Sequence, residues 1–365
     1  MNDITIDKTG WKKYRFDEMV QNISERVEPS QTDLDVYVGL EHIDPDSLHI
    51  KRHGHPSDVE GTKLRFYKGD IIFGRRRAYQ RKTAMATTDG ICSAHAMLLR
   101  AKEDVVDPMF LPFLFHSKSF IDMAITISVG GLSPTINWKD IAKQEFLLPP
   151  KPEQKRLAAL LWAADEMIEK EKKELEKLCS HTSVLITSLF RTNKKTTRKL
   201  IDIANFTMGQ SPIGSSYNEQ QQGMPFLQGN SEFTELYPCS NKYTTQPTKT
   251  AKAGDILMSV RAPVGAINIA DKQYCIGRGL CALSAKDGDN DYLKFLLQSL
   301  LPEFKRISTG STFKAINSDD LKRIDVPNEK IDITLLLKNE ETISIIENQI
   351  RHSQQIKQDL INKTL

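Results

Sequence analysis

Two long segments of the chain repeat apolar residues with a helical period. The first runs from Pro152 to Phe190 without another Gly or Pro, and Pro152 suits the first turn of a helix. Its apolar residues recur every seven positions, which is typical of a coiled-coil seam. Eight of ten positions in the two rows are apolar: Leu157, Leu161, Ala164, Ile168, Glu171, Leu175, Leu178, Thr182, Leu185 and Leu189.

A second stretch, Leu335 to Leu365, is less regular but also lacks Gly and Pro. We therefore expect two long helices that pair with each other, although two ordinary packing helices are the alternative. A helix of about 38 residues would be ~57 Å long and would act as a spacer.

The remaining segments alternate short strands and helices. Apolar runs bounded by Gly, Asp or Pro predict strands at 35–40, 70–74, 94–99, 255–260 and 266–270. Apolar-faced runs predict helices at 108–115 and 291–300. Each globular part is therefore expected to belong to the α+β class.

The chain also repeats itself at an interval of about 180 residues. Lys68-Gly-Asp-Ile-Ile aligns with Ala253-Gly-Asp-Ile-Leu, and a Gly-rich loop ending in Ile136-Asn aligns with one ending in Ile316-Asn. This interval is too long for a solenoid repeat.

We predict a duplicated unit, with globular domains at 1–147 and 193–327 and long helices at 148–192 and 328–365.

Composition narrows the class of protein. A length of 365 residues predicts two or three domains, and 39% hydrophobic with 27% charged residues is typical of a soluble globular chain. No apolar run approaches a membrane span, and the N-terminus lacks the basic and apolar regions of a signal peptide. Five scattered cysteines fit a reducing cytoplasm better than a disulfide framework.

The net charge of +3 hides two basic clusters. Residues 51–82 hold ten Lys and Arg against three acids, and residues 191–199 hold five Lys and Arg and no acid. Clusters of this kind can neutralise DNA phosphates. Each cluster taken alone also fits an ordinary solvated surface.

Motifs for catalysis are absent or incomplete. Gly277-Arg-Gly279 resembles a dinucleotide fingerprint, but no following strand carries the expected acid. Asp107-Pro-Met-Phe lacks the second proline of an amino-methyltransferase, and Glu171-Lys-Lys has a nuclease-like spacing but lies on the helical seam. His53-Gly-His lacks further metal ligands. We therefore predict neither a catalytic residue nor a metal site.

The order of these parts resembles the specificity subunit of type I restriction–modification systems. Leu148-Pro-Pro-Lys-Pro-Glu-Gln is close to the family's helix start, and Asp165-Glu-Met-Ile is similar to a segment that follows it. The two repeated motifs complete the likeness, which covers nearly the whole chain. The second copy departs from the pattern, because Pro327-Asn-Glu-Lys-Ile-Asp lacks both the Pro-Pro and the Glu-Gln pairs.

The resemblance implies two target recognition domains that each read one half of a gapped double-stranded DNA site. An antiparallel coiled coil of the two helices would hold the domains apart with pseudo-two-fold symmetry. Two methyltransferase subunits would bind S-adenosylmethionine and methylate adenine, and motor nuclease subunits would use ATP and magnesium. The chain itself would be non-catalytic, bind no cofactor and work in a prokaryotic cytoplasm.

Two other hypotheses remain open at this point. The chain could be the recognition half of a single-chain methyltransferase or nuclease, which the missing motifs argue against. It could also be a coiled-coil scaffold without a role on DNA, which the duplicated basic domains argue against.

Candidate DNA contacts follow from the basic clusters and the repeated motifs. Arginine matches both the guanine edge and the phosphate, and Gly-rich loops let the backbone approach phosphates or form tight turns. Gln210 begins a loop that resembles a variable part of the family's second domain. The predicted contacts are Lys51, Arg52, Arg75, Arg76, Arg77, Gly130, Ser133, Thr135, Gln210, Ser211, Arg261, Ser311, Thr312 and Lys314.

Overall fold

The structure is a computed structural model that describes residues 7–192, 196–235, 237–309 and 315–365. The chain divides into two compact units: unit 1 comprises Met1–Lys173 with Ile346–Leu365, and unit 2 comprises Glu174–Ile345. Each unit contains one globular domain and a part of each long helix. The division therefore runs through the helices rather than between the four segments that the sequence suggests.

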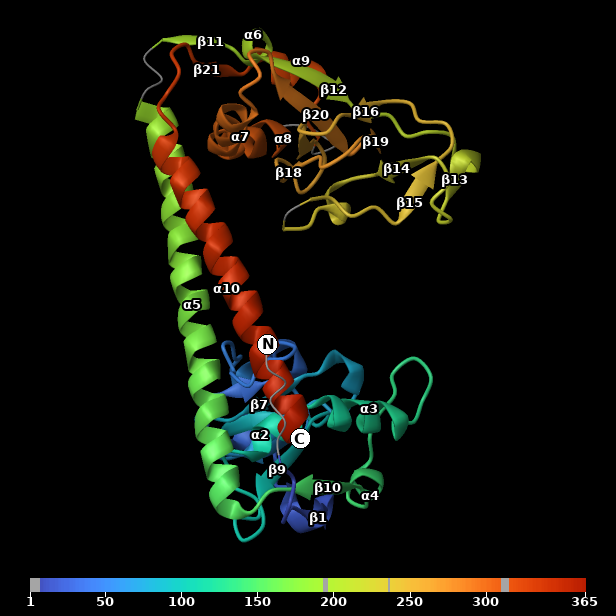
Figure 1. The fold of residues 1–365 in the computed structure, drawn as a ribbon, viewed down its shortest axis with the longest axis vertical. Coiled ribbons are helices and arrows are strands. Elements are labelled where there is room, and N and C mark those ends of the chain that lie inside the picture. Colours follow the sequence, from blue (N-terminus) through green and yellow to red (C-terminus); the bar gives the residue numbers. More distant parts are fainter. Residues whose placement is uncertain (1–6, 193–195, 236, 310–314) are drawn as a thin grey trace. The chain divides into compact units, whose positions relative to one another are not determined.

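Unit 1 combines short strands, short helices and parts of two long helices (Figure 1). Its strands are β1 (Lys12–Arg15), β2 (Val20–Ile23), β3 (Arg26–Val27), β4 (Tyr37–Val38), β5 (Lys63–Phe66), β6 (Ile71–Phe73), β7 (Thr83–Met85), β8 (Gly90–Cys92), β9 (Met97–Ala101) and β10 (Glu145–Leu148). Its helices are α1 (Phe16–Met19), α2 (Leu111–Leu114), α3 (Lys118–Thr126), α4 (Trp138–Ile141), the first part of α5 (Lys151–Thr192) and the last part of α10 (Thr334–Thr364).

Unit 2 has the same kinds of element. Its strands are β11 (Thr197–Lys199), β12 (Ala204–Met208), β13 (Tyr217–Asn218), β14 (Met224–Leu227), β15 (Lys242–Thr244), β16 (Thr250–Ala251), β17 (Ile256–Ser259), β18 (Ile267–Ile269), β19 (Tyr274–Ile276), β20 (Leu280–Ala285) and β21 (Asp325–Pro327). Its helices are α6 (Leu200–Ile203), α7 (Asn290–Ser299), α8 (Leu301–Thr309) and α9 (Ser318–Arg323), together with the remaining parts of α5 and α10.

The two units share the strand order of their first sheet and one parallel pair in their second, which has four strands in unit 1 and five in unit 2. Unit 1 has a sheet in the order β2-β9-β6-β7, and unit 2 has its counterpart in β12-β20-β17-β18. A second sheet, β3-β5-β8-β4 in unit 1 and β13-β15-β14-β19-β16 in unit 2, contains one parallel pair in each case, β4 with β8 and β14 with β19. The strand pairs β1·β10 and β11·β21 complete the match. The duplicated α+β unit is thus confirmed.

Each unit buries its own apolar core between the first sheet and the helices. In unit 1 the rings of Phe16, Phe73, Phe115 and Phe120 lie within 6.1 Å of one another in adjacent pairs. In unit 2, α7 and α8 bury Phe295 and Phe304 against β17 and β20. The second sheet of each unit has a smaller core of its own.

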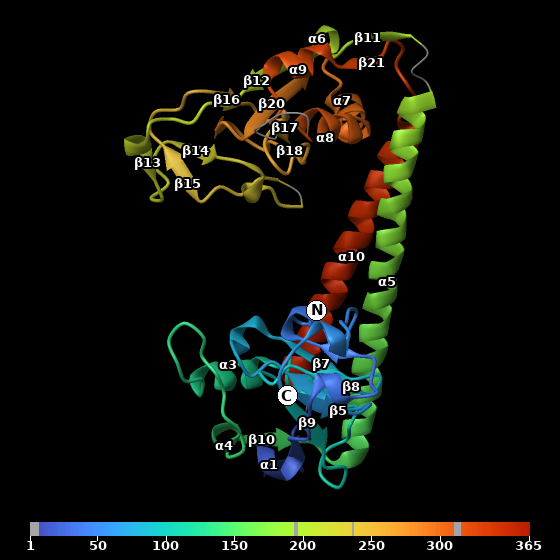
Figure 2. The ribbon, with the colours of Figure 1, turned by 180° about the vertical axis from the view of Figure 1, so that it is seen from behind.

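The two long helices are close to the predicted ones, and their seam is the predicted seam. All ten seven-residue positions of α5 are buried or half-buried. In unit 1, Asp165 of α5 contacts Lys357 of α10, and in unit 2, Thr182 of α5 contacts Asn339 of α10. Since the residue number rises along α5 as it falls along α10, the helices pair antiparallel in both units (Figures 1 and 2).

Three predicted elements are shorter or shifted in the structure. The strand expected at 35–40 covers only Tyr37–Val38, because a turn begins at Leu40. The strand expected at 94–99 begins at Met97, because the Ala96 N–H donates to the Ser93 carbonyl and closes a turn first. The helix expected at 108–115 covers only Leu111–Leu114, because the chain before it turns back to the carbonyl of Asp107. Among the described residues, no helix combines the length and the apolar character that a bilayer span requires.

Candidate nucleic-acid interface

The repeated Gly-Asp-Ile motif builds the turn that begins β6 and β17. The carboxylate of Asp70 accepts the Tyr67 N–H at 2.9 Å, and that of Asp255 accepts the Lys252 N–H at 2.7 Å. The glycine before each aspartate has a positive φ, +93° at Gly69 and +86° at Gly254, which favours glycine. These residues therefore shape the start of each strand.

Three consecutive arginines follow β6, and they differ in what their side chains contact. The Arg75 Nη2 donates to the Ala94 carbonyl at 3.3 Å, and this side chain lines a cleft of 340 Å³ together with Arg26 and Trp138. The guanidinium of Arg77 donates to the Ser133 hydroxyl at 3.0 and 3.2 Å. Arg76 is exposed, and the described part of the chain offers its guanidinium no hydrogen bond or ion pair.

The two repeated motifs meet in space in each unit. The backbone of Arg76 forms a β-bridge with Thr135, and the backbone of Arg261 forms the corresponding bridge with Ala315. The next residue of each loop is held in the same way, because Ile136 N–H donates to Arg75 O at 2.9 Å and Ile316 N–H to Val260 O at 2.8 Å. Arg76 and Arg261 thus occupy equivalent, exposed positions, as the sequence alignment predicts.

The Gly-rich loop of unit 1 is a closed hairpin-like connection. Val129 and Thr135 exchange both backbone hydrogen bonds, at 3.0 and 2.9 Å, and the Thr135 hydroxyl donates to the Ser133 carbonyl. Gly130 is exposed and has φ +120°, so it supplies the bend. Ser133 and Thr135 are half-buried and help to hold the loop. The predicted contacts Ser311, Thr312 and Lys314 lie outside the described residues.

Lys51 and Arg52 do not join this group in the structure. The Lys51 ammonium pairs with Glu169 of α5 at 2.5 Å, and Arg52 pairs with Asp44. Burial alone would raise the pKa of Glu169, but the hydrogen bonds and charges of Lys172 and Lys51 lower it. Both cations therefore have carboxylate partners of their own, whereas Arg76 does not.

Gln210 and Ser211 lie just after β12, where two backbones cross closely. Gln210 is exposed, and its N–H donates to the Ile276 carbonyl at 2.9 Å. A Cβ on the neighbouring Gly209 would lie 2.1 Å from the Gly277 carbonyl oxygen, and one on Gly279 would lie 2.5 Å from the Gln228 carbonyl oxygen. Close backbone packing thus accounts for the glycines that resemble a dinucleotide fingerprint.

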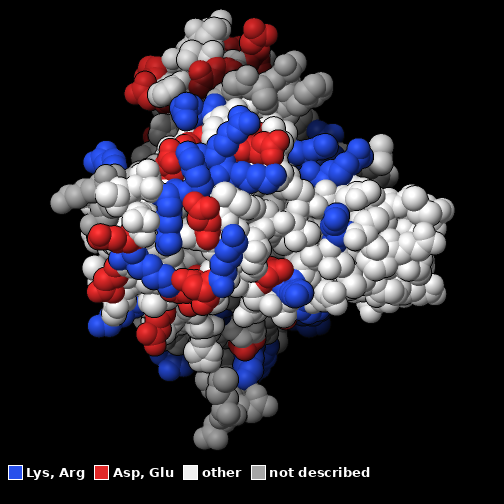
Figure 3. Space-filling model, turned by 90° about the horizontal axis from the view of Figure 1, so that it is seen from above, with Lys and Arg blue, Asp and Glu red and all other residues white. Residues whose placement is uncertain are grey.

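The surfaces of the two units differ in charge. Residues 51–82, with ten Lys and Arg, align at the repeat offset with residues 236–267. The second segment contains one acid, Asp255, and four basic residues: Lys242, Lys249, Lys252 and Arg261. Residues 210–235 contain no Lys or Arg and are rich in Gln, Asn and Ser. In Figure 3 the lobe at the right, where Figure 1 places β13–β15, shows mostly uncharged side chains.

Comparison with known proteins gives one answer. The sequence model of the type I restriction modification DNA specificity domain matches twice, at residues 10–179 and 193–363. The chain belongs to the type I restriction–modification DNA specificity family. The match covers both copies of the repeat, so the family domain itself is duplicated here.

Individual relatives agree with this assignment. A chain named as the type I restriction enzyme MjaX specificity subunit of Methanocaldococcus jannaschii is 30% identical over 79% of this chain and 75% of its own length. The type I restriction enzyme EcoDI specificity subunit of Escherichia coli is 28% identical over 50% of this chain and 41% of its own. A solved chain from work on assembly and conformational transition of the type I R-M system is 26% identical, with a TM-score of 0.63 and coverage of 98% and 97%. The chain is a DNA-specificity protein that serves sequence recognition in a type I system.

Two family motifs of this specificity chain join the domain of unit 1 to α5. The buried Gln154 accepts the Asp107 N–H at 2.7 Å and donates to the carbonyls of Pro149 and Val105 at 2.9 and 3.2 Å. Trp162 Nε1 donates to the Met109 carbonyl at 2.8 Å. The Glu-Gln pair of the helix start is therefore structural: its glutamine fixes the loop before α2 on the first turns of α5.

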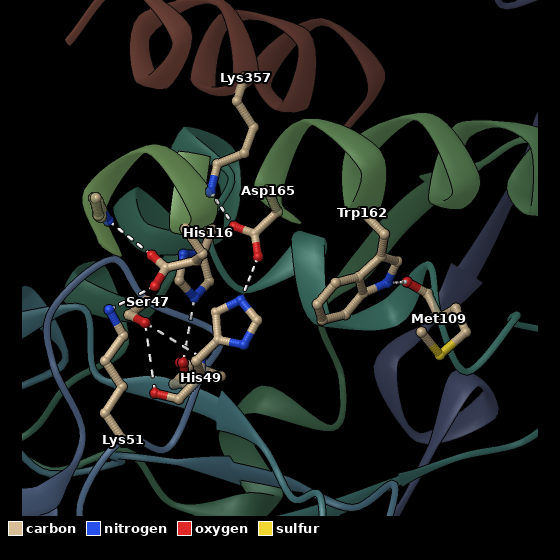
Figure 4. A network of polar contacts seen from close by, with 11 residues as sticks. Ser47, His49, Lys51, Met109, His116, Trp162, Asp165 and Lys357 are labelled. Carbon is tan, nitrogen blue, oxygen red and sulfur yellow. Dashed lines mark hydrogen bonds and ion pairs between the residues drawn. The ribbon is translucent and has the colours of Figure 1, made fainter. Parts of the chain in front are cut away.

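The aspartate of the second motif is the centre of a polar network (Figure 4). Asp165 leaves only 4% of its side chain exposed, and it accepts hydrogen bonds from His49 Nε2 at 2.5 Å and Lys357 Nζ at 2.6 Å. Burial alone would raise the pKa of Asp165, but the His49 hydrogen bond and the Lys357 charge lower it to about 2. The Asp165 hydrogen bond in turn raises the pKa of His49.

His49 and Lys357 were not among the residues that the sequence singled out. Asp165 had a detectable signal, since it lies four residues after Leu161 and three before Ile168, and therefore on the buried face of α5. Its partners come from a loop and from α10, and no local pattern links those segments. The network joins the recognition domain of unit 1 to both long helices at once.

Proposed function

We propose that each unit of this chain binds one half of a bipartite, gapped DNA site. Unit 1 would contact DNA through the edge that Arg76 and the 129–135 loop form, and unit 2 through the equivalent edge at Arg261. The observation that carries the proposal is the pair of matching bridges, Arg76 with Thr135 and Arg261 with Ala315. Exposed arginines at equivalent places in a duplicated unit suit two half-sites of one DNA.

In this proposal the chain supplies specificity and partner subunits supply the chemistry. Two methyltransferase subunits bind S-adenosylmethionine and methylate an adenine in each half-site, and motor nuclease subunits use ATP and magnesium to restrict unmodified DNA. The complex would act in the cytoplasm, on the DNA of the cell. The antiparallel α5–α10 pair would set the gap, because symmetric readers place their half-sites about one helical turn, ~34 Å, apart.

Methylation sequencing tests the proposal directly. The full chain would be expressed with its methyltransferase subunit in a host that lacks adenine methylation, beside a host with the methyltransferase subunit alone. We expect adenine methylation at one two-part motif only when the chain is present. A stable complex that leaves the DNA unmodified would contradict the proposal.

Two variants test each unit in turn. Arg76→Ala in unit 1 and Arg261→Ala in unit 2 should each weaken methylation of the whole motif, because a lost phosphate contact lowers affinity for every sequence. S-adenosylmethionine binding by the chain without partners would instead favour a single-chain methyltransferase.

A further inference from the structure

The tip of the 129–135 loop in unit 1 carries a leucine that nothing in the fold covers. Leu132 is 96% exposed, more than any other large apolar residue among those described. It sits at the centre of the connection that the Val129–Thr135 pair closes, two residues from Gly130. A leucine side chain left in water forgoes the favourable free energy of burial. In both ribbon views the loop between α3 and α4 extends away from the rest of unit 1 (Figures 1 and 2).

The base of this loop is firmly held. Both backbone hydrogen bonds between Val129 and Thr135 are present, the Arg77 N–H donates to the Pro134 carbonyl at 2.8 Å, and the Arg77 guanidinium holds Ser133. Arg77 itself has φ +56°, an unusual value for a residue other than glycine, and these contacts maintain it. The leucine is therefore presented at the tip of a loop whose base is held by hydrogen bonds of Val129, Ser133, Pro134 and Thr135.

The surroundings of Leu132 are basic, and its exposed apolar neighbours along the chain are Val129, at the base of the loop, and Ile125 of α3. No acidic residue lies between Asp122 and Asp140, and Arg76 and Arg77 are exposed beside the loop. A protein partner would need a wider apolar patch, since the strong residues of protein interfaces sit inside a ring of other contacts. An apolar side chain that enters DNA needs only a gap between two base pairs and cations for the neighbouring phosphates.

We propose that Leu132 inserts from the minor groove between two base pairs of the half-site that unit 1 binds, and partly unstacks them. The inference rests on the proposed function, because it assumes that unit 1 binds DNA. The side chain leaves water for the stacked bases, and Arg76 and Arg77 neutralise the phosphates beside the opened step. The kinked step adds specificity without a base-edge hydrogen bond, because flexible steps open at a lower cost than stiff ones. The position of unit 2 that aligns with Leu132 lies outside the described residues, so the proposal concerns unit 1.

The test uses the full chain in complex with its methyltransferase subunits. Duplexes containing the motif from methylation sequencing would carry 2-aminopurine at successive positions other than the target adenines. We expect a several-fold rise in fluorescence at one step of the first half-site. In Leu132→Ala this rise should disappear and affinity should fall about tenfold, which corresponds to about 1.4 kcal/mol. Leu132→Phe should retain the signal, and Ile125→Ala, an exposed apolar residue of α3, should match the unchanged protein.

Each outcome has a defined meaning. If the complex shows no preference for the motif duplex, the proposed function fails, and the insertion of Leu132 fails with it. If binding is specific but fluorescence rises at no step, or rises equally in Leu132→Ala, the insertion is wrong. If Leu132→Ala instead releases the methyltransferase subunits during gel filtration, Leu132 contacts a protein and the proposal is overturned.

Discussion

Unit 1 and unit 2 share the strand order of their first sheet but join their long helices in different ways. Unit 1 packs Leu157 of α5 into its apolar core and adds buried polar groups, namely Gln154 with three backbone partners and Asp165 with His49 and Lys357. Unit 2 packs Phe190 of α5 and Leu336 of α10 directly into its apolar core and adds the ion pair of Lys294 with Glu340.

The two helix–domain contacts should therefore differ in how strongly the loss of one residue destabilises them. Buried polar groups must all be satisfied together, so they permit a single docking geometry and are costly when one partner is lost. An apolar contact with one half-buried ion pair is less directional, and a pair that water still reaches contributes little. The degraded helix start of the second copy, which lacks Pro-Pro and Glu-Gln, is therefore accompanied by a different kind of joint.

The units also differ in charge and in titratable groups. Unit 1 holds the ten basic residues of 51–82, whereas the aligned part of unit 2 holds four. Seven of the eight histidines are in unit 1, and His181 is in unit 2. We expect unit 1 to respond more strongly to pH, and its binding to depend more on salt.

The largest expected effect is the loss of the buried carboxylate in unit 1. Asp165→Ala leaves Lys357 and His49 without their common partner and should destabilise unit 1 by about 4 kcal/mol. Glu340→Ala removes a more exposed carboxylate from unit 2 and should cost about 0.5 kcal/mol.

Intrinsic fluorescence separates the two units in this experiment. All three tryptophans, Trp11, Trp138 and Trp162, belong to unit 1, so their signal follows the urea unfolding of that unit. Circular dichroism follows both units. If the shift of the circular dichroism transition of unit 2 in Glu340→Ala equals the shift of the tryptophan transition in Asp165→Ala, the joints do not differ as described.

The next effect is a loss of stability of unit 1 in acid. Burial lowers the pKa of His116, which is 4% exposed, to about 4 from the usual 6.5. Between these values the unfolded chain binds a proton that the folded chain does not, so stability falls as the pH drops from about 6.5 to 4. A shift of this size corresponds to at most about 3 kcal/mol.

The measurement is the pH dependence of tryptophan-detected unfolding, in His116→Gln beside His53→Gln at an exposed position. The slope between pH 6.5 and 4 should flatten only in the first variant, whatever its absolute stability. His49 acts in the opposite sense in a separate range. Its raised pKa means that its contribution is present below pH 6.5 and is lost as the pH rises through the raised value. An unchanged slope in His116→Gln would contradict the assignment.

The sequence predicts the parts of this chain that depend on period and repetition. The seven-residue rows predict the bounds of α5 to within two residues. The offset between Gly69 and Gly254 predicts that the two units have equivalent strands. It also places Arg76 and Arg261 at equivalent positions, although their contact with DNA stays a prediction.

What the sequence does not supply are contacts between distant segments that have no period in common. His49 lies 116 residues from Asp165, and Lys357 lies 192 residues from it. The same limit applies to Lys51, which looks like part of a basic cluster along the chain but pairs with Glu169 of α5 in the fold.

The smallest effect compares the two equivalent arginines. Each Arg→Ala change at position 76 or 261 should lower the slope of log affinity against log salt by about 0.9, because one phosphate contact is lost. This change in slope depends on the number of phosphate contacts that are lost and not on the local net charge. It should therefore be the same in both units despite their different surfaces. Arg52→Ala is the matched control, since Arg52 already pairs with Asp44 and should leave the slope unchanged. The measurement is fluorescence anisotropy of the motif duplex with the methyltransferase complex over a salt series. A slope that falls for Arg52 but not for Arg76 would move the interface of unit 1 from the 129–135 loop to the loop around residue 52.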